Sequence, residues 1–135
     1  SHISKIPDKY SCKGQDINPP LIIENLPSNA KSLVLIMDDP DAPVGTWDHW
    51  IVWNINSKTK EIKEDSTPGV QGVNSWGRND YGGPCPPSGT HRYFFKLYAL
   101  DTTLNLSESS KKRDVEKAIQ DHILDKTELI GLFSK

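Results

Sequence analysis

A continuous apolar run that stops at a cluster of prolines and carboxylates constrains the fold of this 135-residue chain more than any other feature. Residues 31–37, Lys-Ser-Leu-Val-Leu-Ile-Met, carry β-branched and aliphatic side chains at consecutive positions, which is typical of a strand buried on both faces. Residues 38–43, Asp-Asp-Pro-Asp-Ala-Pro, cannot continue a central strand because proline donates no ladder hydrogen bond. We therefore expect a central strand that ends at a carboxylate-rich rim.

The remaining pattern indicates further strands and one helix. Strand-forming segments are predicted at 21–23, 49–55, 92–100 and 128–133. The spacing of apolar residues over 111–123 predicts a helix, with Ser107, Ser109 or Ser110 as its N-cap. Residues 56–90 are rich in glycine, proline and asparagine, and we interpret them as long connecting loops.

The order of these segments predicts the fold class. Strands that follow one another without intervening helices favour a mainly β protein, an antiparallel β-sandwich rather than a parallel sheet. The helix near the C-terminus is then peripheral. A length of 135 residues is that of one domain, so we expect residues 1–135 to form a single domain.

Composition excludes several classes of function. Sixteen basic and eighteen acidic residues give a formal net charge of -2, which disfavours non-specific binding of nucleic acid. No apolar run approaches the length of about 18 residues that a membrane-spanning helix requires. We expect a cytoplasmic protein, with the periplasm as the alternative compartment.

The two cysteines, Cys12 and Cys85, are too few for a disulfide framework and match no metal-binding spacing. Two small, mostly buried free thiols are the favoured interpretation. A bond between them is the alternative.

Three polar clusters lie at predicted strand ends, at 38–41, 47–50 and 84–93. If those strands are neighbours, the clusters converge on one rim. Each cluster also has a purely structural interpretation: an Asp-Pro-Asp turn, a hydrogen-bonded histidine, or a loop stiffened by prolines. Arg92 is expected to form a buried ion pair with Asp39 or Asp41.

The order of four motifs is more specific than any one of them. Asp-Pro-Asp-Ala-Pro at 39–43, Thr-Trp-Asp-His-Trp at 46–50, Gly-Pro-Cys-Pro-Pro at 83–87 and His-Arg-Tyr at 91–93 follow one another. Together they resemble the phosphatidylethanolamine-binding protein family, also called the Raf kinase inhibitor-like family. Further motifs at 6–14, 18–21, 77–81 and 129–131 resemble its bacterial and archaeal branch.

The resemblance implies a fold and a site. The fold would be a β-sandwich with one large and one small sheet. A small pocket that accepts phosphate-like anions would be lined by Asp39, His49, His91 and Tyr93. Its walls would include Pro43, Trp47, Cys85, Pro86 and Pro87, with Asp41 and Arg92 in support. The Ala42–Pro43 bond would be cis, as prolines in tight turns sometimes are.

The resemblance also implies non-enzymatic binding of phosphate-like anions, phosphorylated small molecules or phospholipid head groups. A regulatory or inhibitory role toward kinases or serine proteases would accompany it, and the protein could form a homodimer. We expect no cofactor, no resident metal and no catalytic residue. The alternative is an enzyme in which Asp39 works with His49 or His91 in hydrolytic acid–base chemistry.

Overall fold

The structure is a computed structural model that describes residues 3–135. These residues form a mainly β structure with ten helices and strands. They are β1 (Ile3–Lys5), the 3-10 helix η1 (Asp8–Tyr10), β2 (Leu21–Ile22), β3 (Ser32–Asp39), β4 (Trp47–Asn56), β5 (Glu61–Ile62), β6 (Val70–Gln71), β7 (Thr90–Leu100), α1 (Lys112–Ile119) and β8 (Ile123–Ser134). The segment 56–90 therefore contains two short strands in addition to its loops.

One large and one small sheet form, as the family resemblance predicts. The large sheet has six strands in the order β1-β8-β7-β3-β4-β6, and β2 pairs with β5 in the small sheet. All pairings are antiparallel except that β1 lies parallel to β8. The expected mainly β fold is thus confirmed, and the parallel edge strand is a feature that the sequence pattern does not predict.

Strand β3 lies at the centre of the large sheet, and all eight of its residues are buried. Because strand side chains alternate between faces, Leu33, Leu35 and Met37 belong to one hydrophobic cluster, whereas Val34 and Ile36 belong to a second. The prediction of a strand buried on both faces is confirmed.

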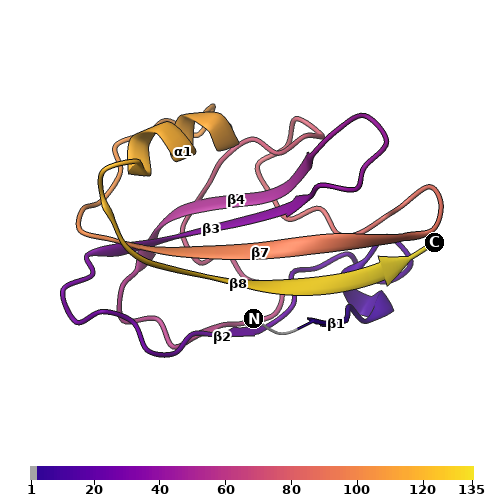
Figure 1. Ribbon diagram of the computed structural model, residues 1–135, viewed down its shortest axis with the longest axis horizontal. Coiled ribbons are helices and arrows are strands. Elements are labelled where there is room, and N and C mark those ends of the chain that lie inside the picture. The colour runs from indigo at the N-terminus through magenta and orange to yellow at the C-terminus, as the bar shows by residue number, and fades with distance from the viewer. Residues whose placement is uncertain (1–2) are drawn as a thin grey trace.

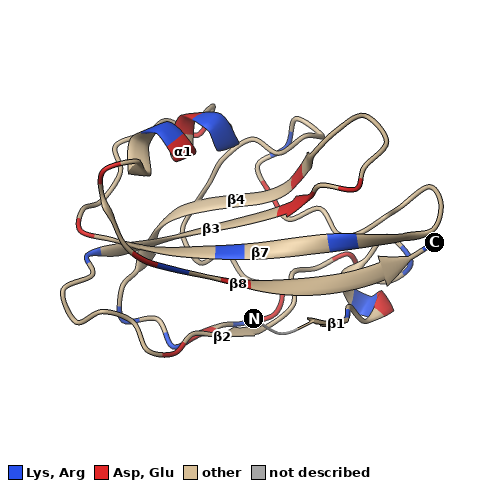
Figure 2. Cartoon of the chain, viewed as in Figure 1, with Lys and Arg blue, Asp and Glu red and all other residues tan. Residues whose placement is uncertain are grey.

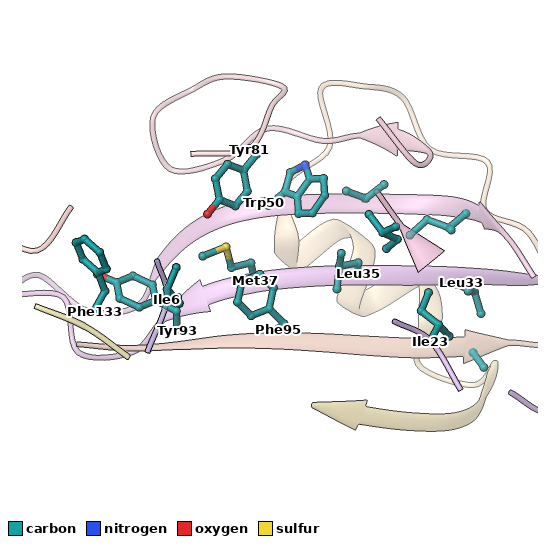
Figure 3. Packing of buried hydrophobic residues seen from close by; sticks show 14 residues of the cluster. Ile6, Ile23, Leu33, Leu35, Met37, Trp50, Tyr81, Tyr93, Phe95 and Phe133 are labelled. Atoms are coloured by element: carbon teal, nitrogen blue, oxygen red, sulfur yellow. The ribbon is translucent and has the colours of Figure 1, made fainter. Parts of the chain in front are cut away.

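The two clusters separate three layers. Helix α1 covers one face of the large sheet, and β2 lies on the opposite side (Figure 1). Val115 and Ile119 of the helix are buried against the sheet. On the other face, Met37, Phe95 and Tyr93 lie along the same side of neighbouring strands (Figure 3).

Helix α1 begins and ends inside its predicted range, and its cap differs from the prediction. Lys111 is the N-cap residue, so none of the three serines holds that position. Instead, the backbone N–H of Lys111 donates to the Asp114 carboxylate at 2.9 Å. A carboxylate in the first turn satisfies a free N–H and opposes the positive end of the helix dipole.

The prediction of two buried free thiols is wrong. Cys12 and Cys85 are both exposed and form a disulfide, with their Cα atoms 5.5 Å apart. The bond joins the N-terminal segment to the loop before β7. Two hydrogen bonds to backbone carbonyls bring the segments together: Cys12 N–H donates to Pro84 O at 3.1 Å, and the side-chain hydroxyl of Tyr81 donates to Tyr10 O at 2.7 Å. The two cysteines are 73 residues apart in the sequence, and no local pattern indicates that they are close in the fold.

Acidic and basic residues are interspersed over the helix and the sheet rather than gathered by sign (Figure 2). Among residues 3–135, no helix has the length and apolar character needed to cross a membrane.

Replacing both cysteines with serine is expected to lower the free energy of unfolding by about 2–4 kcal/mol, because the bond restricts a long loop in the unfolded chain. Urea denaturation followed by tryptophan fluorescence measures the change. Added reductant should lower the midpoint of the wild-type protein and leave the double variant unchanged. Equal midpoints for oxidised wild type and the variant would contradict the stabilising role.

Candidate functional site

A cavity of about 340 Å³ opens at the edge of the large sheet where β3 ends and β4 and β7 begin. Antiparallel neighbours bring these ends together. All nine residues that the resemblance assigns to the pocket line this one cavity: Asp39, Pro43, Trp47, His49, Cys85, Pro86, Pro87, His91 and Tyr93. Ala42, Val44 and Trp76 line it as well.

The three carboxylates at the end of β3 and in the loop that follows it have different partners. Asp38 faces the helix side of the sheet, where Lys96 Nζ lies 3.0 Å and Lys112 Nζ 3.3 Å from its Oδ2. Asp39 is buried on the cavity side and bonds His91. Asp41 lies in the following loop and pairs with Arg92. Only Asp39 therefore contributes a carboxylate to the cavity lining.

The Asp39–His91 pair is the most buried ionisable contact of the cavity. Nδ1 of His91 lies 2.7 Å from Oδ2 of Asp39, and both side chains are buried. The other oxygen, Oδ1, accepts from the backbone N–H of Asp41 at 2.7 Å. The carboxylate is thus held by the loop and the neighbouring strand, and it fixes the orientation of the imidazole.

The Asp41–Arg92 pair clamps the loop after β3 to strand β7. The Arg92 guanidinium donates to both Asp41 oxygens, at 2.9 Å from Nε and 2.8 Å from Nη2, and the Arg92 backbone N–H donates at 2.9 Å. These bonds hold the pKa of Asp41 at about 2, below its usual value. Asp41 is one of the two partners expected for Arg92. The expectation that this ion pair is buried is wrong, because both side chains are partly exposed.

A β-bulge turns His49 into the cavity. Met37 pairs with Trp50 and Asp38 pairs with Asp48, so His49 is an extra residue on β4. In an unbroken strand, His49 would face away from the side on which Trp50 packs. With the bulge, it lines the same cavity as Asp39.

His49 is held by the backbone of Gly82. Its Nδ1 lies 2.7 Å from Gly82 O, and its own carbonyl accepts from Gly82 N–H at 3.1 Å. The ring packs edge-to-face against Tyr93 and Trp76. Burial lowers the pKa of His49, which favours the neutral ring.

Trp76 forms part of the wall that sequence reasoning missed. A tryptophan is most often a core residue, whereas Trp76 is 39% exposed and packs edge-to-face on Trp47. Gly82 lets the indole lie against the backbone, since a Cβ there would collide with the ring. The adjoining motif at 77–81 was the one sequence signal for this wall.

The cavity lining contains no lysine or arginine among the described residues. Positive charge inside it must therefore come from imidazole. Tyr93 supplies a neutral hydroxyl, because burial and the nearby Asp39 carboxylate raise the pKa of that group. Within residues 3–135, no three His, Cys, Asp or Glu side chains are arranged to hold a metal ion.

The proline-rich walls are braced from outside. Cys85 is tied to Cys12, and Gly83 N–H donates to Asp16 Oδ1 at 2.7 Å. No peptide bond in the described chain is cis, so the expectation of a cis bond between Ala42 and Pro43 is wrong. The Asp41–Arg92 clamp closes the turn with trans geometry.

The sequence profile of the phosphatidylethanolamine-binding protein family matches residues 1–134. A UPF0098 protein of Pyrococcus horikoshii is 50% identical over 140 residues, which cover 96% of this chain and 71% of the relative. A Chlamydia trachomatis crystal structure, described as a putative phosphatidylethanolamine-binding protein (PEBP) homolog, matches with a TM-score of 0.96 at 42% identity, over 100% of this chain and 92% of that one. The crystal structure of Escherichia coli YbcL, described as a new member of the mammalian PEBP family, matches with a TM-score of 0.90 at 27% identity, over 98% and 92%.

Replacing Arg92 with glutamine is expected to raise the pKa of Asp41 from about 2 toward about 3.9, the ordinary value. Because the folded-state pKa is the lower one, the pair stabilises the fold above about pH 4, and this contribution is lost as pH falls toward about 2. Carboxyl ¹³C NMR measures the titration, with Arg113→Gln on helix α1 as the control. An unchanged midpoint in Arg92→Gln would contradict the clamp.

Proposed function

Because the chain belongs to the phosphatidylethanolamine-binding protein family, we propose that its cavity binds phosphate-like anions, including the phosphorylated head groups of small molecules or lipids, without chemical turnover. The observation that carries the proposal is the convergence of Asp39, His49, His91 and Tyr93 on one cavity. Their side chains combine one carboxylate, two imidazoles and one hydroxyl in a partly enclosed space.

The electrostatics of the cavity support binding that depends on protonation. Asp39 repels an anion, and no lysine or arginine in the described lining offsets it. A protonated His91 neutralises Asp39 at 2.7 Å and leaves its Nε2–H to donate to a ligand oxygen. The hydroxyl of Tyr93 is a second donor. Affinity should therefore rise as the pH falls through the range in which imidazole side chains take up a proton.

The partner proposed for the protein is a kinase or a serine protease, as the family resemblance implies. The surface suited to contact it is the exposed rim of the cavity, where Pro43, Val44 and Pro87 project, Val44 being 86% exposed. This rim is held by the Asp41–Arg92 clamp on one side and by the disulfide on the other. A rigid rim loses little conformational entropy when a partner binds.

A phosphate monoester titrated into the protein should bind more tightly at about pH 5.5 than at about pH 8, the range in which histidine titrates. Histidine NMR shifts report binding, and we expect them at His49 and His91. His91→Gln should weaken binding by at least about tenfold, the cost of one charge-assisted hydrogen bond.

His122 provides a matched control, since its Nδ1 lies 2.8 Å from Asp101 in an exposed pair outside the cavity. His122→Gln should bind like wild type. Absence of shifts at both cavity histidines under saturating ligand would refute the proposed function.

A second candidate is a hydrolase, and the Asp39–His91 hydrogen bond is the observation that favours it. A carboxylate that orients an imidazole is the arrangement of a general base. A screen with phosphatase and esterase substrates should give the same background rate for wild type and His91→Ala. Turnover by wild type that His91→Ala abolishes would establish the enzyme instead.

A further inference from the structure

The partners of the two cavity histidines fix where each ring carries its proton. Nδ1 of His49 faces the carbonyl oxygen of Gly82, and Nδ1 of His91 faces the carboxylate of Asp39, each at 2.7 Å. A carbonyl and an ionised carboxylate only accept hydrogen bonds, so Nδ1 must be the donor in both rings. In the neutral ring, Nε2 is then a bare acceptor.

Both Nε2 atoms are available to a ligand. Neither has a hydrogen-bond partner among the described residues, and both rings line the cavity. The buried side-chain nitrogen and oxygen atoms without a hydrogen-bond partner in residues 3–135 are Trp53 Nε1 and Asp48 Oδ1, and the latter forms an ion pair with Lys112 Nζ at 2.7 Å. Each Nε2 therefore reaches the cavity surface.

The two rings differ in the groups that would surround the positive charge of a doubly protonated imidazole. At His91 the added charge lies against the Asp39 carboxylate and forms an ion pair. At His49 the bonded partner is a neutral carbonyl, and the packed neighbours Tyr93 and Trp76 are uncharged. His49 as a whole residue is only 3% exposed to solvent.

The three carboxylates nearest to His49 in the chain or across the strands are already engaged. Asp39 of β3 is bonded to His91, whereas Asp38 of β3 and Asp48 of β4 both lie against Lys112. None is free to act as the counterion of a protonated His49. Burial accordingly favours its neutral form, with Nε2 as an acceptor.

We propose that His49 selects the protonation state of the ligand: the cavity takes a singly ionised phosphoryl group whose remaining P–O–H donates to Nε2 of His49 while a P–O⁻ oxygen accepts from Nε2–H of protonated His91. The inference rests on the proposed function and deepens it by naming the ligand class. Inorganic phosphate and phosphate monoesters belong to this class. Sulfate and phosphate diesters do not, so the inference narrows the lipid head groups of the proposed function to those that end in a phosphate monoester.

The selection follows from a mismatch of acceptors. An oxygen without a proton would place its lone pairs against the lone pair of His49 Nε2, leaving a desolvated acceptor without a donor. Such an unpaired buried group costs about 1–3 kcal/mol, equivalent to about tenfold or more in affinity. A site built to pair with a ligand hydroxyl rejects an analogue that lacks it.

The test compares three anions at about pH 6 and constant ionic strength, near the second pKa of phosphate monoesters. Inorganic phosphate carries a proton, dimethyl phosphate has a single charge and no proton, and sulfate has two charges and no proton. Phosphate should bind at least about tenfold more tightly than the other two. Equal binding of dimethyl phosphate or sulfate overturns the inference and leaves the proposed function standing, whereas no binding of any anion overturns both.

His49→Gln tests the residue itself. A glutamine amide can turn either a donor or an acceptor to the ligand, so the preference for phosphate over sulfate should fall below about threefold. His122→Gln should keep the wild-type preference. An unchanged preference in His49→Gln overturns the inference.

The wild-type protein supplies a second readout that does not depend on the variant's folding. Imidazole ¹⁵N NMR at about pH 6 should show a proton on Nδ1 of His49 and none on Nε2. An imidazole free in solution would be largely protonated on both nitrogens at this pH. Phosphate should shift the Nε2 resonance as it accepts the hydrogen bond. A doubly protonated His49 in the free protein at that pH overturns the inference.

Discussion

Burial of strand β3 on both faces is the constraint on which the rest of the structure depends. Its side chains alternate between the core under helix α1 and the core toward the small sheet, so its register cannot slip by one residue without exchanging both sets. The same alternation delivers Asp38 to the lysines on the helix side and Asp39 to the cavity. Core packing and site chemistry are therefore set by one strand.

The end of β3 also explains how a protein of net charge -2 could form the anion site proposed above. Asp38 and Asp41 are neutralised by lysine and arginine outside the cavity, and Asp39 has a counterion only when His91 is protonated. The field inside the cavity thus depends on one proton rather than on a basic surface. Proline and disulfide bracing keep the groups that share this proton in place.

The parts of the fold that sequence predicts are those that follow local periodicity or a specific motif order. The continuous apolar residues of β3 and the four ordered motifs identified the central strand, the family and the residues that surround the cavity. Periodicity could not place His49, because one extra residue in β4 reverses the face it occupies. The Cys12–Cys85 bond depends on a fold-level contact between distant segments, and Trp76 reaches the wall only because Gly82 lacks a side chain.

The contact between His49 and the Gly82 carbonyl has a consequence for how the site can diverge. A side-chain acceptor can be lost through a single codon change, whereas a main-chain oxygen persists whatever residue is encoded there. Gly82 cannot readily be replaced either, since any Cβ would displace Trp76. Few substitutions at position 82 would therefore change the tautomer of His49. A change in the hydrogen bond that His49 offers to the cavity would require replacing His49 itself or rebuilding the loop that carries Gly82.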